Sequence, residues 1–169
     1  MNRRRFQDLV VPHADALWSV ARRACGDDAS ADDVLQQALL TALVRIDELR
    51  EPAAARRWAT RIVVRTYLDG ERRRRPEAGG SLADVVGSGA DPEHALASRR
   101  ASEQIDAAFD ALPSDQRAAV WLVDAEGFTF AEAAETLGVA PGTAASRVAR
   151  GRSTLRRLLA GLHEPRRQG

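Results

Sequence analysis

Apolar residues recur at the three-to-four-residue spacing of amphipathic helices along most of the chain, and no alternating β pattern competes with them. In the first half this spacing predicts three helices, which cover residues 4–25, 30–46 and about 54–71. We expect Ser30-Ala31-Asp32-Asp33 to form a capping box at the second helix start, because its hydroxyl and carboxylate can satisfy amides left over there. The pattern therefore predicts an all-α fold.

The pattern changes between Pro76 and Ser98, where Gly, Pro, Ser and acidic residues replace the helical spacing. This composition is typical of a flexible linker, so we expect two small helical bundles joined by an acidic tether. In the second bundle the spacing predicts four helices, of which the first ends at Pro113 and the second is capped by Ser114. The predicted division is 1–75 for the first domain, 76–98 for the linker, 99–163 for the second domain and 164–169 for a tail.

The last two predicted helices have the pattern of a helix-turn-helix. Thr129-Phe130-Ala131-Glu132 has the form of a capping box, and Gly138 can adopt the left-handed conformation that ends a helix before a tight turn. Pro141 is favoured in the first turn of the next helix, which begins with small residues and continues with arginines. Such a second helix enters the major groove of duplex DNA. The residues expected at the DNA are Gly142, Thr143, Ser146, Arg147, Arg150 and Arg152. A solvated amphipathic hairpin is the simpler alternative.

A second basic segment lies on the third predicted helix and just beyond it. Its arginines and aromatic residues are Arg56, Arg57, Trp58, Arg61, Arg65, Tyr67 and the run 72–75. Arginines that bind phosphates, together with rings that stack on unpaired bases, hold single-stranded DNA. Two simpler explanations stay open: Trp58 is a core residue, and the arginine run is a solvated face. We expect residues 1–75 to form a compact bundle with the arginines on a common outward surface.

Composition limits the other classes of function. The net charge is +1, and all 25 basic residues are arginine, which indicates a coding bias and is not evidence for DNA binding by itself. The single Cys25 and three dispersed histidines predict no disulfide, no metal and no cofactor. The sequence has no nucleophile–base pair and no phosphate-binding glycine loop, so we expect no enzyme. Short apolar runs and the lack of a secretory pattern predict a cytoplasmic protein without membrane insertion.

Taken in order, these motifs resemble the extracytoplasmic-function sigma factors of bacterial RNA polymerase. The second half resembles region 4, which recognises the −35 promoter element as duplex, at Leu112-Pro113, Arg117, Glu126-Gly127, Glu132, Ala134, Leu137-Gly138, Gly142-Thr143, Ser146-Arg147 and Leu155. The first half resembles region 2 at two motifs. One, at 31–36, is similar to the motif that docks on the β′ clamp helices; the other, at Trp58, Arg61, Ile62 and 69–75, is similar to the segment that melts and holds the −10 element.

The resemblance implies a sigma factor that directs promoter-specific initiation by binding core polymerase, the −35 duplex and the opened −10 element. The −10 residues that it implies are Trp58, Arg61, Arg65, Asp69, Arg72, Arg73 and Arg75. The polymerase-binding residues that it implies are Asp33, Gln36 and Leu39, although Asp33 is also explained as a helix cap. The implied partners are the RNA polymerase core, through its β′ clamp helices and β flap, promoter DNA and an anti-sigma factor, with no small-molecule substrate.

Several positions depart from the family pattern, three of them in the segments expected to bind DNA. Arg65 stands where the family usually has an Asn that captures a flipped base, Ala145 stands at a usually basic position of the recognition helix, and Ala140 stands where Ser or Thr is common. The alternative function is a stand-alone helix-turn-helix transcriptional regulator. This alternative explains residues 112–158 but gives no function to residues 30–75.

Overall fold

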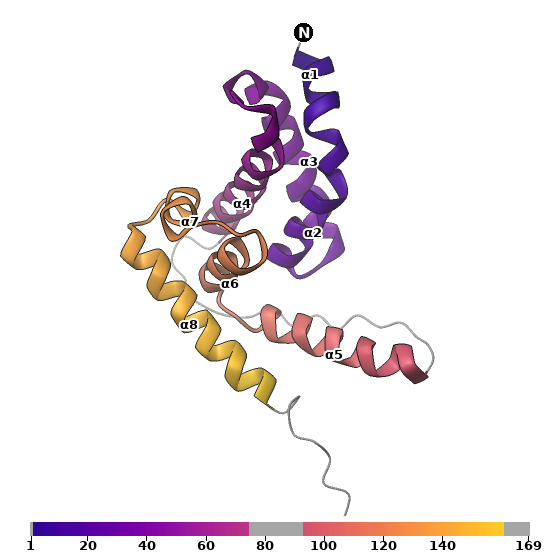
Figure 1. Ribbon diagram of the computed structural model, residues 1–169, viewed down its shortest axis with the longest axis vertical. Coiled ribbons are helices and arrows are strands. Elements are labelled where there is room, and N and C mark those ends of the chain that lie inside the picture. Colours follow the sequence, from indigo (N-terminus) through magenta and orange to yellow (C-terminus); the bar gives the residue numbers. More distant parts are fainter. Residues whose placement is uncertain (1, 75–92, 161–169) are drawn as a thin grey trace, which may run out of the picture.

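The chain folds into two groups of helices in the computed structural model, which describes residues 2–74 and 93–160 (Figure 1). The first group consists of α1 (Asn2–Leu9), α2 (Ala14–Cys25), α3 (Asp28–Arg45) and α4 (Ala55–Arg74), with 3₁₀ turns at Val11–His13, Ile46–Glu48 and Pro52–Ala54. The second consists of α5 (Glu93–Asp110), α6 (Ser114–Val120), the π-helical turn η4 (Trp121–Ala125), α7 (Phe130–Leu137) and α8 (Pro141–Leu159). The described residues contain no strand, and the all-α prediction is confirmed.

The first predicted helix is divided in two. Pro12 has no amide hydrogen with which to continue α1, so the chain makes the 3₁₀ turn Val11–His13 before α2 begins. Gly26 ends α2 in the left-handed region, at φ 85°, as its position in the pattern predicted. The capping box predicted at Ser30 is wrong, because the carboxylate of Asp27 accepts a hydrogen bond from the Ser30 amide at 2.8 Å and starts α3 earlier.

The second group differs from the prediction at two helix starts. Helix α5 begins at Glu93, inside the range predicted as linker, and residues 75–92 lie outside the described residues. Ser114 is the first residue of α6 and not its cap, since the cap position belongs to Pro113, whose side chain offers no acceptor. The predicted set of four helices is otherwise present, with η4 extending α6 by a turn.

Small side chains set the helix spacing in the first group. Helices α2, α3 and α4 pack on one another, and Ala21, Ala38 and Ala59 are buried on them. Buried alanines let helix backbones approach closely, while Leu17 and Ile46 fill the remaining space at the density of a protein interior. The result is a helical bundle built from residues 2–74, as predicted.

In the second group, α8 (Pro141–Leu159) crosses α6 at Gly151. A Cβ atom added at Gly151 would lie 2.5 Å from Cγ2 of Val120, closer than two such carbons can pack. The crossing therefore requires glycine, and it fixes the position of α8 relative to α6.

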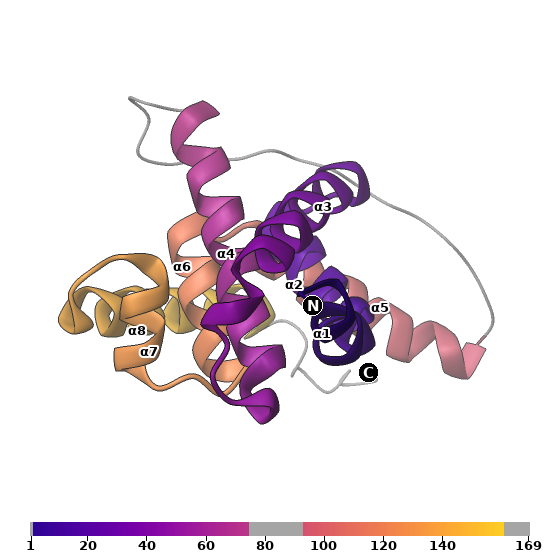
Figure 2. The same cartoon turned by 90° about the horizontal axis from the view of Figure 1, so that it is seen from above.

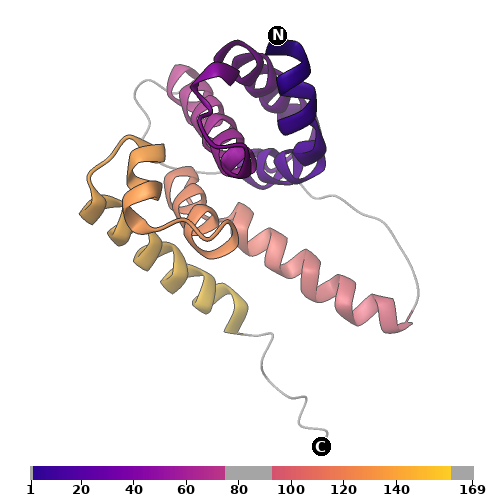
Figure 3. The ribbon, with the colours of Figure 1, turned by 45° about the horizontal axis from the view of Figure 1, so that its top comes forward.

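The two groups lie against each other. Helix α7 lies beside α4, and α5 and α6 contact α2, so that α1–α4 and α5–α8 form neighbouring bodies (Figure 3). Their buried side chains form one continuous cluster that includes Val63 of α4 and Phe128 before α7. Across residues 2–74 and 93–160, no helix has the length and apolar character that crossing a membrane requires.

Candidate nucleic-acid interface

The helix-turn-helix consists of α7, a short turn and α8. Thr129 caps α7 in both directions of the predicted box: its hydroxyl accepts from the Glu132 amide at 3.2 Å, and its own amide donates to the Glu132 carboxylate at 2.8 Å. Gly138 ends α7 at φ 67° in the left-handed region. Both local predictions are confirmed, and together they fix where α8 begins.

The first half of α8 presents a face to solvent. Ala144 and Val148 are buried against the rest of the second group, whereas Gly142, Thr143 and Arg150 are exposed. Ser146 lies partly exposed between them, and its hydroxyl donates to the Thr143 carbonyl at 2.9 Å. The helix starts at Pro141 with Ala140 in the cap position and no side-chain cap. The side chains available for base contact are therefore small, with arginine at the edge.

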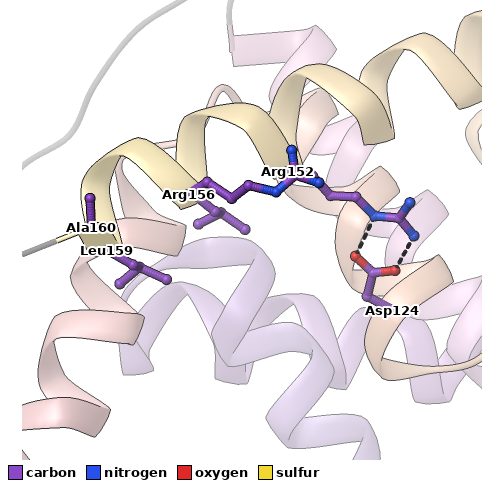
Figure 4. Close-up of a pocket in the computed structure, with 6 residues that line it drawn as sticks. Asp124, Arg152, Arg156, Leu159 and Ala160 are labelled. Atoms are coloured by element: carbon purple, nitrogen blue, oxygen red, sulfur yellow. Dashed lines mark hydrogen bonds and ion pairs between the residues drawn. The ribbon is translucent and has the colours of Figure 1, made fainter. Parts of the chain in front are cut away.

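Two arginines of α8 are held by acids of their own helix group. Nε of Arg147 lies 3.1 Å from the carboxylate of Asp115 on α6. Arg152 donates twice to Asp124 of η4, at 3.0 and 2.5 Å. Figure 4 shows this pair at a pocket of about 470 Å³, lined also by Leu155, Arg156, Leu159 and Ala160. Arg152 thus points to the side of α8 that meets η4, and its −35 role stays a prediction.

The arginines of α4 share a face, and the second helix group covers part of it. Arg57 and Arg61 lie next to Glu132, at 3.2 and 3.5 Å, and Arg65 donates to backbone carbonyls at the end of α7. The predicted common surface therefore exists, with Arg56, Arg72 and Arg73 exposed, but Arg61 and Arg65 are partly covered by α7. The physical reason is that acidic residues in and before α7 attract these arginines, a contact between distant segments that helical spacing cannot predict.

The aromatic and terminal residues of the −10 segment have mixed environments. Trp58 is partly buried and packs against the core, which agrees with its simpler explanation. At the end of α4, Arg72 lies 3.5 Å from Asp69, and Arg73 is exposed. Arg75 lies outside the described residues. The −10 roles of these residues stay predictions.

Helix α3 carries an exposed face with polar and apolar residues. Asp33 and Gln36 are exposed, whereas Leu39 is partly buried and packs against the core. Sequence reasoning missed Leu40 and Val44, whose side chains are 54% and 78% exposed. Their spacing from Gln36, four and eight residues, places them on one helix face, which was the signal available in the sequence.

Several titratable groups among the described residues have shifted pKa values, and three of them lie near these surfaces. Burial raises the pKa of the Cys25 thiol to about 12, and nearby Asp27 acts in the same direction. Burial also raises the pKa of Tyr67. The Glu132 pKa is lowered, first by the Thr129 amide that donates to it and to a smaller extent by nearby arginines. Within the part of the chain that the structure describes, no group of three His, Cys, Asp or Glu residues could hold a metal ion.

Comparisons with known proteins agree with this arrangement. Residues 9–77 match the family model described as Sigma-70 region 2, and residues 102–155 match the one described as Sigma-70, region 4. The first match covers the half of the chain that a stand-alone helix-turn-helix regulator leaves unexplained, so that alternative is not favoured.

Curated relatives and solved structures point the same way. The chain is 40% identical over 157 residues to the ECF RNA polymerase sigma factor SigM of Mycobacterium tuberculosis, covering 91% of this chain and 76% of that protein. It is 35% identical over 157 residues to EcfG of Rhodopseudomonas palustris, covering 91% and 84%. The sigma factor RpoE of Bartonella quintana, solved in complex with the anti-sigma factor NepR, matches with a TM-score of 0.68 and 25% identity, covering 92% of this chain and 96% of that one. The chain therefore belongs to the extracytoplasmic-function sigma factors of the sigma-70 family, and it is an RNA polymerase sigma factor.

Proposed function

We propose that this sigma factor uses three surfaces, two for promoter DNA and one for core polymerase, that it has no catalytic activity of its own, and that it acts in the cytoplasm beside the polymerase. The observation that carries the proposal is the exposed first half of α8, which follows the capped helix α7 and a tight turn. A recognition helix in this position inserts its first residues among base edges and uses later arginines on phosphates.

The −35 surface is the exposed face of α8. Thr143 and Ser146 carry hydroxyls that can contact base edges, and Gly142 lets the DNA approach the backbone. Arg147 lies at the flank, where Asp115 holds it in one orientation before DNA arrives. Arg150 is exposed beside it and suits a phosphate contact. Because Ala145 adds no charge to this face, base contacts depend on few side chains.

The −10 surface is the arginine face of α4 together with the exposed end of that helix. Arg61 and Arg65 provide several N–H donors each, and Arg72 and Arg73 continue the positive charge toward residue 75. Trp58 packs against the core and supports this face from below. Single-stranded DNA suits such a surface because its phosphates are accessible along one strand. The domain division 1–75, 76–98, 99–163 and 164–169 is proposed with it, α5 beginning within the second range at Glu93.

The surface proposed for the polymerase core is the exposed face of α3, with Asp33 and Gln36 beside Leu40 and Val44. Exposed apolar side chains rimmed by polar ones are typical of protein interfaces. Val44→Glu should weaken binding to core polymerase about tenfold or more, because it places a charge in a desolvated contact. Val11→Glu, at another exposed valine of the same bundle, is the matched control. If both variants bind core polymerase equally well, α3 is not part of the interface.

An anti-sigma factor is proposed as a further partner. Two solved structures with matching folds contain a sigma factor with such a partner: RpoE with NepR, and CnrH with the cytosolic domain of CnrY. The second of these has a TM-score of 0.62 and 26% identity. Copurification of the chain with its native partners, followed by inhibition of transcription by any protein recovered, tests this part of the proposal.

The decisive experiment is in vitro selection of promoters with purified core polymerase and the full chain. We expect enrichment of DNA with two conserved elements at −35 and −10 spacing, and specific transcripts that core polymerase alone does not make. Tight binding of the chain to duplex DNA without any response to core polymerase would contradict the proposal. That outcome would favour the stand-alone regulator instead.

A further inference from the structure

We propose that α8 selects thymine bases in the −35 element, through the methyl groups of Thr143 and Ala149, which contact the C5-methyl of thymine in the major groove. The inference rests on the −35 role proposed for α8. It adds Ala149 to the DNA-binding surface, and it names the class of base that this helix reads.

Five neighbouring positions form one patch near the start of α8. Ser146 is at its centre: Gly142 and Thr143 stand four and three residues before it, and Ala149 and Arg150 stand three and four residues after it. Residues three and four apart are neighbours on a helix surface, so the five positions are contiguous. Ser146 is partly exposed and the other four are exposed. These five residues are called the recognition patch below.

The opposite side of α8 is fixed in the second helix group. Ala144 and Val148 are buried, and Gly151 lies so close to Val120 of α6 that a Cβ atom does not fit between them. The rotation of α8 about its own axis is therefore set, and the recognition patch faces away from the group. Figure 2 shows α7 and α8 together at one edge of the structure, with α4 and α6 between them and α1–α3. A DNA duplex can approach α8 from that edge.

The arginines at the flanks of α8 do not belong to the patch. Arginine reads guanine best among the bases, through two parallel donors to its O6 and N7 atoms. Nε of Arg147 lies 3.1 Å from the carboxylate of Asp115. Arg152 donates twice to the carboxylate of Asp124. Arg150 pairs with no acid among the described residues and suits a phosphate contact. With Arg150 on a phosphate, no guanidinium of the patch remains for the bases.

The groups that the patch then offers to the bases are mainly methyl groups. Thr143 carries a methyl and a hydroxyl, and the side chain of Ala149 is a methyl alone. The Ser146 hydroxyl already donates its hydrogen to the Thr143 carbonyl at 2.9 Å, so toward DNA it can only accept. Thymine is the base that carries a methyl group in the major groove, and the methyl groups of Ala and Thr pack against it. The patch therefore favours thymine.

Short side chains also let α8 approach the base edges closely. Two methyl groups are in contact only when their carbon atoms are about 4 Å apart. Gly142 has no side chain and Ala149 ends at Cβ, while Ala145, beside the patch, is equally short. An arginine at position 145 would hold this side of the helix away from the floor of the groove. The small residues thus make the methyl contacts geometrically possible.

The test uses the −35 element that core polymerase with the full chain selects from random DNA. Each thymine of that element, on either strand, is replaced singly by deoxyuridine, which keeps the base pair and lacks only the C5-methyl. Fluorescence anisotropy measures binding of the polymerase complex to each labelled promoter duplex. We expect a loss of about fourfold at two of these thymines, as the burial of one methyl-sized group contributes. Thymines outside the promoter elements should show no such loss.

Variants of the chain assign each contact. Thr143→Ser removes the methyl and keeps the hydroxyl, so one thymine should bind no better than deoxyuridine, whereas Thr143→Val keeps a methyl and should keep the wild-type preference. Ala149→Gly should abolish the preference at the other thymine. Ser153→Gly, at an exposed position outside the patch, is the matched control and should leave both preferences unchanged. The measured quantity is the ratio of the affinities for thymine and deoxyuridine, which a general loss of helix stability does not alter.

Each contrary result has a distinct meaning. A selected −35 element without thymine would overturn thymine recognition, although recognition of the −35 element would still stand. Equal binding of thymine and deoxyuridine throughout the element would mean that duplex shape selects any A·T pairs there, and would also overturn the inference. A preference that persists in both Thr143→Ser and Ala149→Gly would assign it to other residues. Selection that yields no −35 element would instead contradict the proposed function itself.

Discussion

Two sets of arginines in this chain have opposite relationships to the acids that hold them. On α8, Arg147 and Arg152 pair with Asp115 and Asp124, which belong to the same helix group. On α4, Arg57 and Arg61 lie next to Glu132 of the other group, and Arg65 donates to carbonyls at the end of α7. A pair within one group requires only that this group is folded. A pair between groups also requires that the two groups pack against each other.

The contrast gives the same residue type two environments. Arg147 is oriented by Asp115 at the edge of the exposed face that is proposed to bind duplex DNA. Arg61 and Arg65 are partly covered by α7, whose Glu132 carboxylate and last carbonyls contact them. Sequence alone gives both sets the same appearance, that of arginines on one face of an amphipathic helix. What separates them is the element that lies opposite.

The largest expected effect concerns Cys25, which ends α2 next to the second helix group. A Cβ atom at neighbouring Gly26 would lie 3.6 Å from Asp110 and 3.8 Å from Arg117. With its pKa raised to about 12, the thiol should be alkylated by iodoacetamide at pH 8 roughly a thousandfold more slowly than an ordinary thiol.

The pH dependence of this reaction has a definite sign. Because burial favours the neutral thiol, the folded state gains from this group below the ordinary thiol pKa and loses that gain as pH rises toward 12. The alkylation rate should therefore keep rising above pH 9. A wild-type rate equal to that of the urea-unfolded chain would show that Cys25 is not shielded.

A second prediction concerns the arginines of α8. Arg147→Ala should lower −35-dependent transcription by the equivalent of about 1–3 kcal/mol of binding, because it removes a charged donor from the edge of the recognition face. The control is Arg157→Ala, which removes an exposed arginine from the last turn of α8. Quantified transcripts from a selected promoter provide the measurement. Equal output from Arg147→Ala and wild type would count against the proposed −35 surface.

A third prediction tests the close crossing of α8 over α6, which holds the arginines of α8 in place. Gly151→Ala forces a methyl group into Val120, and overpacking of this kind costs roughly 1–3 kcal/mol, part of which the better helix propensity of alanine offsets. Urea unfolding should show a lower free energy of unfolding. Gly70→Ala, in α4 with no atom within 4 Å of the added Cβ, should instead raise it. If both variants change the free energy of unfolding in the same direction, the close packing of α8 on α6 at Gly151 is contradicted.

The smallest expected effect concerns Arg152. A double-mutant cycle of Arg152→Ala and Asp124→Ala should give a coupling of about 0.5–1 kcal/mol in the free energy of unfolding, as partly exposed pairs do. Promoter binding by Arg152→Ala should change less than binding by Arg147→Ala. If Arg152→Ala instead reduces −35 binding with no coupling to Asp124, the residue returns to the DNA surface as the sequence first predicted.

Local sequence signals were accurate where one short segment contains all the interacting atoms. Thr129 and Glu132 stand three residues apart and form their capping box, and Gly138 adopts the conformation that its position predicted. The predicted start of α3 was wrong for a related reason, because Asp27 offers a competing cap three residues before Ser30. Two caps in neighbouring positions satisfy the same rule, and the pattern does not rank them.

By itself, the sequence determined the helices, the cap and turn residues between them and the family motifs. Helical spacing, caps and turns act over a few neighbouring positions. Only the tertiary structure decided which faces of those helices are covered. The exposure of Val44, the fixed position of Arg152 and the cover over Arg61 each depend on a segment distant in sequence. Helix packing and charge pairing between such segments follow from the three-dimensional arrangement, which the spacing of residues along one helix does not specify.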